Sequence, residues 1–345
     1  MTPIWPALPP SNPVSAPDAT QMSSTDMRSE QGTDVTRLAV SADLRDSFER
    51  LKAELLTDLG PAEIEPYRQL AERRAPELAT LANTFGMEWE DLSLEGGVEV
   101  TRLWPRGSVA KERSGTIVFL HGGGLIAGCR ADGLDVVLEP AAALSVEVWT
   151  VEYGLAPSTR FADAVEQCLT AVDAALSAGS GPVVIAGQSA GGGLAAAVTL
   201  LDRDRTGGRL AGQLLICPML HPASDTTSML QFESDPLWSR ISNATAWRAA
   251  QGKAEQHTGI GPAGQHERLD ALPPTFLDSG SAEVFRDDIV SFASRLWAAG
   301  VPTELHVWEG GYHGFDGVEP LAPVSRQSRT ARTTWLGRLL SGGIS

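Results

Sequence analysis

The spacing of apolar residues near the start of the chain predicts two helices. Apolar side chains recur at steps of four, three and four, at Leu44, Phe48, Leu51 and Leu55. This spacing places them on one face of a helix over residues 42–58, which Gly60 and Pro61 are expected to end. A second helix is expected over residues 62–74. Because each helix must bury its apolar face, we expect both to pack over the rest of the chain.

From residue 97 onward, short apolar runs alternate with helical stretches. The expected strands cover 116–120, 148–153, 183–186, 213–217, 274–278 and 303–308. The expected helices cover 161–178, 190–202, 287–299 and 324–340. Apolar strands that alternate with helices are typical of an α/β fold with a mostly parallel sheet, covered by helices on both faces. Right-handed crossovers place the loops after the strands at one edge of the sheet, where such folds carry their chemistry.

The composition changes along the chain, and we expect three segments. Residues 1–35 are rich in Pro, Ser, Thr, Asp and Gln. They bury too little apolar surface to offset the entropy lost on ordering, so we expect a disordered tail. The tail lacks the basic start and apolar stretch of a signal peptide, and we do not expect it to act as one. Residues 36–90 are expected to form a helical segment and residues 91–345 an α/β domain.

Composition and charge restrict the partners that the chain can bind. Hydrophobic residues make up 42% of its 345 residues, enough for a large core. No apolar run approaches the roughly 18–20 residues that a membrane span needs. The formal net charge is −16, from 27 Lys and Arg against 43 Asp and Glu. This charge repels phosphate backbones and anionic membranes, so nucleic-acid binding is not expected.

Cysteine and histidine usage gives no sign of a disulfide framework or a metal site. Cys129, Cys168 and Cys217 form no CxxC pair and no metal-ligand spacing. A reducing, cytoplasmic compartment therefore fits better than secretion. The six histidines form no HxxxH or HExxH pair, so no structural zinc site is expected.

The sharpest local motif is Gly187-Gln188-Ser189-Ala190-Gly191. It follows an expected apolar strand, and a run of small residues that opens a helix follows it. This strand–turn–helix setting is that of a nucleophile elbow, with the start of the helix near the serine. The alternative is an ordinary glycine-rich turn between a strand and a helix.

A second glycine motif, His121-Gly122-Gly123-Gly124, follows the strand expected at 116–120. Consecutive glycines expose backbone N–H groups, and acyl transfer needs such donors to hold the anion of its tetrahedral intermediate. The alternatives are a flexible loop or a phosphate cradle, but the Lys-Ser/Thr ending of a P-loop is absent. We expect His121 to orient this loop rather than to carry protons.

A candidate base and several candidate acids follow in the last third of the chain. His313 lies in a glycine-flanked loop after the strand expected at 303–308, at the sheet edge that carries Ser189. Four carboxylates follow the strand expected at 274–278, and each is a candidate to orient the base: Asp278, Glu283, Asp287 and Asp288. The chain order of serine, acid and histidine is that of α/β-hydrolases.

Together these residues resemble the hormone-sensitive-lipase-like branch of the α/β-hydrolases, the microbial family IV carboxylesterases. The matching motifs cover roughly residues 90–340 and occur in the family's order: HGGG at 121–124, Tyr-x-Leu-Ala-Pro at 153–157, GxSAGG at 187–192, an acid-x-x-Arg-Asp-acid segment at 283–288 and Tyr-His-Gly-Phe at 312–315. Two positions depart from the family pattern. Gln188 stands where the family has Asp before the nucleophile, and Glu283 stands where the family's acid is Asp.

The resemblance implies a role for each motif residue. Ser189 would be the nucleophile, Glu283 the acid and His313 the base. The oxyanion donors would be the N–H groups of Gly123, Gly124 and Ala190. The resemblance also implies a helical cap, built from residues 36–90 and from an insertion at 218–260 that carries Trp238, Asn243 and Trp247.

The expected function is that of a serine carboxylesterase that hydrolyses small or medium carboxylic esters through an acyl-enzyme, without a cofactor or metal. An amidase, carbamate hydrolase or lactone hydrolase would use the same residues. A small-molecule receptor on a hydrolase scaffold is a further alternative, although such proteins typically lose the base or nucleophile. No GxGxxG opens an early βαβ unit, so a dinucleotide enzyme is disfavoured. The natural substrate stays open, as does the choice between monomer and homodimer.

Overall fold

The computed structural model describes residues 36–179, 181–252 and 259–344, so the tail expected at 1–35 lies outside the described residues. The described chain contains an eight-stranded sheet of order β1-β2-β4-β3-β5-β6-β7-β8. Its strands are β1 (Met87–Ser93), β2 (Glu99–Pro105), β3 (Thr116–Leu120), β4 (Glu147–Glu152), β5 (Val183–Gln188), β6 (Gly212–Ile216), β7 (Thr275–Gly280) and β8 (Thr303–Trp308). β2 pairs antiparallel with β1 and β4, and every other pair is parallel.

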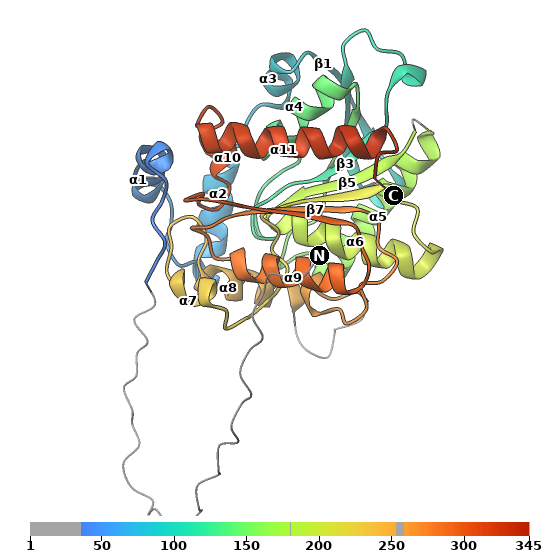
Figure 1. The fold of residues 1–345 in the computed structure, drawn as a ribbon. Helices are drawn as coiled ribbons and strands as arrows, with labels where there is room; N and C mark the ends of the chain where they lie inside the picture. Colours follow the sequence, from blue (N-terminus) through green and yellow to red (C-terminus); the bar gives the residue numbers. More distant parts are fainter. Residues whose placement is uncertain (1–35, 180, 253–258, 345) are drawn as a thin grey trace, which may run out of the picture. The chain divides into compact units, whose positions relative to one another are not determined.

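Helices cover both faces of this sheet, as Figure 1 shows for α11 and α9 on opposite sides of the strands. One face carries α4 (Asp135–Leu144) and α11 (Pro323–Leu340), and the other carries α5 (Phe161–Ala178), α6 (Ala190–Thr206) and α9 (Arg286–Ala298). Successive side chains of a strand point to opposite faces, and β3 shows the result. Ile117 and Phe119 pack in the core under α4 and α11, whereas Val118 and Leu120 pack under α5 and α6. The expected α/β class is confirmed.

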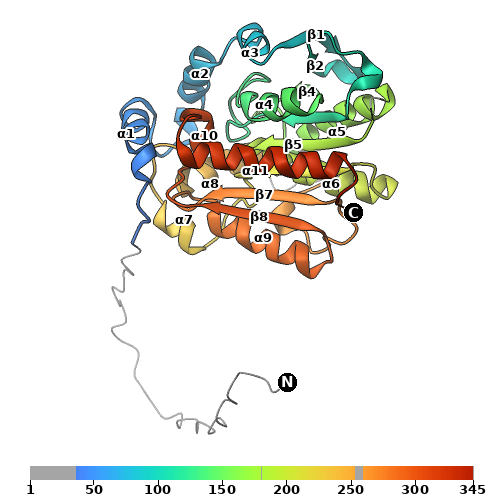
Figure 2. The ribbon, with the colours of Figure 1, turned by 45° about the horizontal axis from the view of Figure 1, so that its top comes forward.

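Of the three α-helices of residues 36–90, two lie near α10 (Phe315–Val318), and the third, α3, lies beside β1 (Figure 2). The helical elements of this segment are η1 (Ala42–Leu44), α1 (Arg45–Glu54), η2 (Pro61–Glu63), α2 (Ile64–Arg74) and α3 (Leu78–Thr84). The first helix was expected to reach residue 58, and this prediction is wrong because α1 ends at Glu54. The chain leaves the helix early, which brings Leu59 into the main core and lets its N–H donate to Ser242 Oγ at 2.9 Å.

The remaining elements include the two helices of the expected insertion. These are α7 (Thr227–Gln231) and α8 (Arg240–Gln251), and the short elements are η3 (Glu95–Gly97), η4 (Ala110–Glu112), η6 (Ala263–Gln265) and α10 (Phe315–Val318). Across the described ranges, no helix combines the length and apolar content that crossing a membrane requires.

A buried ionic cluster ties α11 to the end of β7. Arg332 is 1% exposed, and its guanidinium contacts Asp278 at 2.7 Å and also Asp316, which are both buried. The indole Nε1 of Trp308 donates to Asp278 at 3.2 Å. Asp278 is therefore committed to this cluster, and burial raises the pKa of its carboxyl group. A cation that neutralises two buried carboxylates is hard to remove, because each would then lose its partner in a region of low dielectric.

Arg332→Met is expected to lower the free energy of unfolding by about 3–5 kcal/mol, since it leaves two carboxylates buried without a cation. Urea denaturation followed by circular dichroism measures this change. Arg338→Met is the matched control on the same helix, because Arg338 is 50% exposed and pairs with the half-buried Glu304. It should change the free energy by less than about 1 kcal/mol. Similar small losses in both variants would contradict the expectation.

Candidate active site

Ser189 occupies a strained turn between β5 and α6. Its backbone has φ 56° and ψ −117°, a conformation that residues with a side chain seldom adopt. Glycine is required on both sides of this turn. A Cβ on Gly187 would lie 2.1 Å from the carbonyl oxygen of Gly191, and a Cβ on Gly191 would lie 2.0 Å from the carbonyl oxygen of Leu120. The sharp turn holds Ser189 at the carboxyl end of the parallel strands, at the start of α6.

The imidazole of His313 bridges Ser189 and Glu283. Its Nε2 lies 2.8 Å from Ser189 Oγ, and its Nδ1 contacts a carboxylate oxygen of Glu283. A carboxylate only accepts hydrogen bonds, so Nδ1 carries the proton and Nε2 presents its lone pair to the serine hydroxyl. The structure thus brings together three residues that the sequence places far apart, in the geometry of a nucleophile, a base and an orienting acid.

Glu283 is 1% exposed, and two further donors hold its carboxylate. Oε1 accepts the Gly280 N–H at 3.0 Å and the hydroxyl of Ser279, so Oε2 is left for His313. The other three candidate acids are engaged elsewhere. Asp278 pairs with Arg332, Asp287 pairs with Arg286 and accepts the Ser228 N–H, and Asp288 accepts the Ser224 hydroxyl. Of the four carboxylates, Glu283 is the one that contacts His313.

The loop at 121–124 presents backbone donors beside Ser189. Within the described ranges, the N–H groups of Gly123, Gly124 and Ala190 have no hydrogen-bond acceptor. A Cβ on Gly123, where φ is 106°, would lie 2.1 Å from the carbonyl oxygen of Ala127. A Cβ on Gly124, where φ is 64°, would lie 2.0 Å from the indole ring of Trp238. The close packing on both glycines holds the loop, and its free N–H groups can receive a developing oxyanion.

The buried side chain of His121 packs against this loop. Its ring is buried, stacks on Tyr153 at 4.1 Å and lies with Nδ1 2.7 Å from the carbonyl oxygen of Gly122. The Tyr153 hydroxyl donates to the His121 carbonyl oxygen at 2.7 Å. Burial lowers the pKa of His121 to about 4, so the ring is neutral near pH 7. These contacts match the orienting role expected for His121.

Ser189 and His313 line an open cavity of about 620 Å³. Its apolar side chains come from the two segments expected to form a cap, 36–90 and 218–260, and from α10: Leu81, Phe85, Leu237, Trp238 and Val318. Tyr67 of α2 and the amide of Gln188 add polar groups to the wall. The other two insertion residues singled out in the sequence lie on α8. Asn243 donates to the carbonyl oxygen of His221 at 3.1 Å, and Trp247 packs on Phe161 at 4.9 Å.

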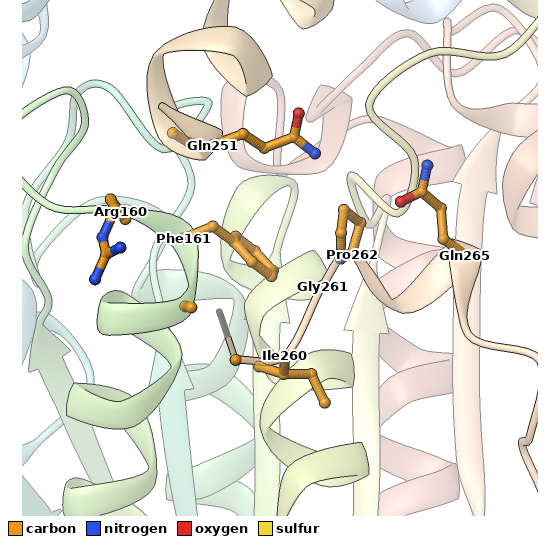
Figure 3. A pocket seen from close by; sticks show the side chains of 10 residues that line it. Arg160, Phe161, Gln251, Ile260, Gly261, Pro262 and Gln265 are labelled. Carbon is orange, nitrogen blue, oxygen red and sulfur yellow. The ribbon is translucent and has the colours of Figure 1, made fainter. Parts of the chain in front are cut away.

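A second cavity, of about 180 Å³, lies at the start of α5 and contains none of the candidate catalytic residues. Figure 3 shows the Phe161 ring directed toward Ile260 and Pro262, with Gln251 and Gln265 at the rim. These residues offer no nucleophile paired with a base, so the candidate site is the cavity that contains Ser189.

Sequence reasoning missed the position of Cys217, which lies beside Glu283 and His313. Among the described residues, Cys217, Glu283 and His313 form a group whose ligand atoms all lie within 4.8 Å of one another. Cys217 follows β6 with φ 36°, and its N–H donates to the carbonyl oxygen of Asp278 at 2.9 Å. No spacing signal exists for three residues that lie on three different loops, so only the folded chain reveals this group.

Comparisons with known proteins point to one family. The chain is 29% identical over 246 residues to the esterase LipI of Mycobacterium tuberculosis, and this alignment covers 67% of this chain and 77% of that protein. It is 29% identical over 254 residues to the carboxylesterase NlhH of the same species, over 70% of this chain and 76% of that protein. Its structure is similar to that of a bacterial heroin esterase, with a TM-score of 0.76 and 29% identity over 88% of this chain and 98% of that chain.

A sequence profile of the alpha/beta hydrolase fold matches residues 117–317, a range that includes the glycine loop at 121–124, Ser189, Glu283 and His313. With the parallel sheet and the esterase relatives, this match confirms the resemblance that the motifs indicated. The chain belongs to the alpha/beta hydrolase fold family, in its hormone-sensitive-lipase-like branch.

Proposed function

We propose that this chain is a serine carboxylesterase that hydrolyses small or medium carboxylic esters through an acyl-enzyme on Ser189. The observation that carries the proposal is the contact of His313 Nε2 with Ser189 Oγ at 2.8 Å, with Glu283 on the other ring nitrogen. Three free N–H groups lie beside this serine, where the carbonyl oxygen of an ester would develop negative charge. The names of the relatives, which are esterases and a carboxylesterase, support ester substrates.

In the first half of the reaction, His313 Nε2 takes the hydroxyl proton while Ser189 Oγ attacks the acyl carbon. The oxyanion is held by the N–H groups of Gly123, Gly124 and Ala190. Glu283 stabilises the imidazolium that forms, because its carboxylate accepts the Nδ1 proton in a hydrogen bond. The imidazolium then gives its proton to the leaving alcohol, and the acyl group stays bonded to Ser189.

In the second half, water replaces the alcohol. His313 takes a proton from water, and the resulting hydroxide attacks the acyl carbon of the acyl-enzyme. The same N–H groups hold the second oxyanion. The bond to Ser189 breaks, the serine recovers its proton from His313, and the carboxylic acid leaves. Every proton and bond is accounted for by the chain's own residues and water.

The size and lining of the cavity restrict which esters can bind. Its volume of about 620 Å³ and the apolar side chains in its wall suit an acyl or alcohol group of modest size. Hydrolysis rates for p-nitrophenyl acetate, butyrate, octanoate and laurate test which acyl lengths the cavity accepts. Butyryl p-nitroanilide, an amide with the same acyl group as the butyrate ester, is the matched comparison. We expect turnover of the acetate and butyrate and far slower cleavage of the anilide. Anilide cleavage as fast as ester cleavage would indicate an amidase, and no turnover with any ester would overturn the proposal.

Gly123→Ala is expected to lower kcat by about 100- to 1,000-fold, the effect of losing one oxyanion donor. The added Cβ would meet the carbonyl oxygen of Ala127 at 2.1 Å, so the loop must shift and move the Gly123 N–H. Steady-state hydrolysis of p-nitrophenyl butyrate measures the change.

Gly300→Ala is the matched control for this variant. Gly300 also has a positive φ of 79°, but a Cβ there would meet nothing within 4 Å. The control therefore carries the same kind of backbone strain outside the cavity and should keep its kcat. An unchanged kcat in Gly123→Ala would rule out the oxyanion role of this loop.

Cellular location and assembly stay predictions. Cys129, Cys168 and Cys217 are all free thiols, which agrees with the reducing, cytoplasmic compartment inferred from the sequence. Size-exclusion chromatography with light scattering would decide between monomer and homodimer.

A further inference from the structure

The thiol of Cys217 lies against the pair formed by the proposed acid and base. Cys217 is 4% exposed, and its Sγ, a carboxylate oxygen of Glu283 and a ring nitrogen of His313 all lie within 4.8 Å of one another. The proposed hydrolysis uses Glu283 and His313 and gives no role to this thiol. A thiol, a carboxylate and an imidazole on three different loops thus converge on one point beside the cavity.

The three groups are those that bind Zn²⁺. This ion takes sulfur, nitrogen and oxygen ligands at about 2.0–2.3 Å in a tetrahedral arrangement. Ligand atoms about 3.3–3.8 Å apart satisfy such bond lengths, so a set within 4.8 Å needs only small side-chain movements to close on an ion. Magnesium and calcium prefer oxygen ligands alone and should bind poorly to this set.

The charge around Cys217 favours a cation. The carboxylates of Glu283, Asp278 and Asp316 act on its thiol, with Arg332 as the opposing positive charge. A dication offsets the same negative charge, and on binding it would release the thiol proton to solvent. His313, the third member of the group, also lines the cavity that contains Ser189.

We propose that Cys217, Glu283 and His313 form an inhibitory binding site for Zn²⁺ and similar thiolate-binding divalent metals. The ion forms bonds to Cys217 Sγ, a Glu283 oxygen and His313 Nδ1, and it breaks the contact between Nδ1 and Glu283. The thiol proton passes to water, and the proton of Nδ1 moves to Nε2, since a neutral imidazole bound to metal through Nδ1 keeps its proton on Nε2.

Inhibition follows from that proton. With Nε2 protonated, His313 has no lone pair to take the proton of Ser189, so the proposed esterase reaction stops at its first step. This consequence rests on the proposed function, whereas metal binding itself does not. The site would couple ester hydrolysis to the concentration of free zinc, and chelation of the metal would restore the base.

The experiment measures binding and inhibition separately on the full chain. Binding is followed with Co²⁺, which gives a thiolate charge-transfer absorption when sulfur is a ligand. Inhibition is followed by titrating p-nitrophenyl butyrate hydrolysis with ZnCl₂, then adding EDTA, with MgCl₂ as the metal control. Each variant is compared with its own metal-free rate. Cys217→Ser and Cys217→Ala remove the ligand, and Cys129→Ser is the matched control at the half-buried thiol.

The wild type and Cys129→Ser should show the Co²⁺–thiolate absorption, zinc inhibition reversed by EDTA and no response to MgCl₂. The Cys217 variants should lack the absorption and need about tenfold or more ZnCl₂ for half inhibition, because a metal ligand is lost. Equal zinc sensitivity in the Cys217 variants, or no Co²⁺–thiolate absorption in Cys129→Ser, would overturn the site. A Co²⁺ absorption that depends on Cys217 in a chain with no ester hydrolysis would instead overturn the proposed function and leave the site standing.

Discussion

Ser189→Ala is expected to lower kcat for p-nitrophenyl butyrate by about 10⁵- to 10⁶-fold, the scale seen when a serine hydrolase loses its nucleophile. The hydroxyl of Ser189 is the group that His313 Nε2 contacts at 2.8 Å, and alanine leaves nothing there to form an acyl-enzyme. The residual rate would come from the oxyanion donors and from binding alone. Labelling with a fluorophosphonate gives a second measurement, because the probe reacts with the activated serine and should leave the variant unlabelled.

Ser177→Ala is the control for this substitution. Ser177 is an exposed serine on α5 whose hydroxyl bonds to the carbonyl oxygen of Asp173. The control should keep full turnover and full labelling. Wild-type rates in Ser189→Ala would mean that another group performs the hydrolysis, and the proposed mechanism would then fail.

Glu283→Gln is expected to lower kcat by about 10³- to 10⁴-fold, since an amide neither fixes the His313 tautomer nor stabilises the imidazolium. The carboxylate accepts the Nδ1 proton of His313, and its other oxygen accepts the Gly280 N–H at 3.0 Å. Glutamine keeps the size of the side chain but loses the charge. Its amide can present an N–H to Nδ1, which drives the ring proton onto Nε2 and removes the base. KM should change little, because Glu283 is not part of the cavity wall.

Asp287→Asn separates this role from a general loss of negative charge. Asp287 pairs with Arg286 and accepts the Ser228 N–H, away from the histidine. Its substitution should change kcat by less than about tenfold, in keeping with a surface contact. Asp278→Asn is less suitable as a control, since it breaks the buried pair with Arg332 and lowers stability. A larger loss in Asp287→Asn than in Glu283→Gln would assign the acid to Asp287.

The central strands were predictable because their signal is local. β3, β5, β6, β7 and β8 all coincide with apolar runs in the sequence to within a few residues. β1 gives no such signal, because most of its side chains are exposed and it pairs only with β2 at the sheet edge. α4 was also missed, and Pro140 within it is a residue that ordinarily ends a helix. Pairing and packing against neighbours decide such elements.

The candidate site also contains parts that the sequence predicts and parts that it does not predict. The turn at Ser189 and the loop at Gly123 and Gly124 are contiguous motifs, and the close backbone approaches at Gly187 and Gly123 are to residues only four positions away. The acid could not be chosen from four neighbouring carboxylates by spacing alone. The resemblance to a family pointed to Glu283, and the folded chain brings that carboxylate to His313 while Asp278, Asp287 and Asp288 are held by other partners.

By itself, the sequence determined the α/β class, the strained turn at Ser189 and the glycine loop beside it, because hydrophobic period and glycine placement act over a few residues. Only the tertiary structure decided which carboxylate meets His313, that Trp238 packs on Gly124 and that Cys217 lies beside Glu283 and His313. Ser189 and His313 are 124 residues apart along the chain. Contacts over such separations depend on how strands pair and loops close, and no local pattern encodes them.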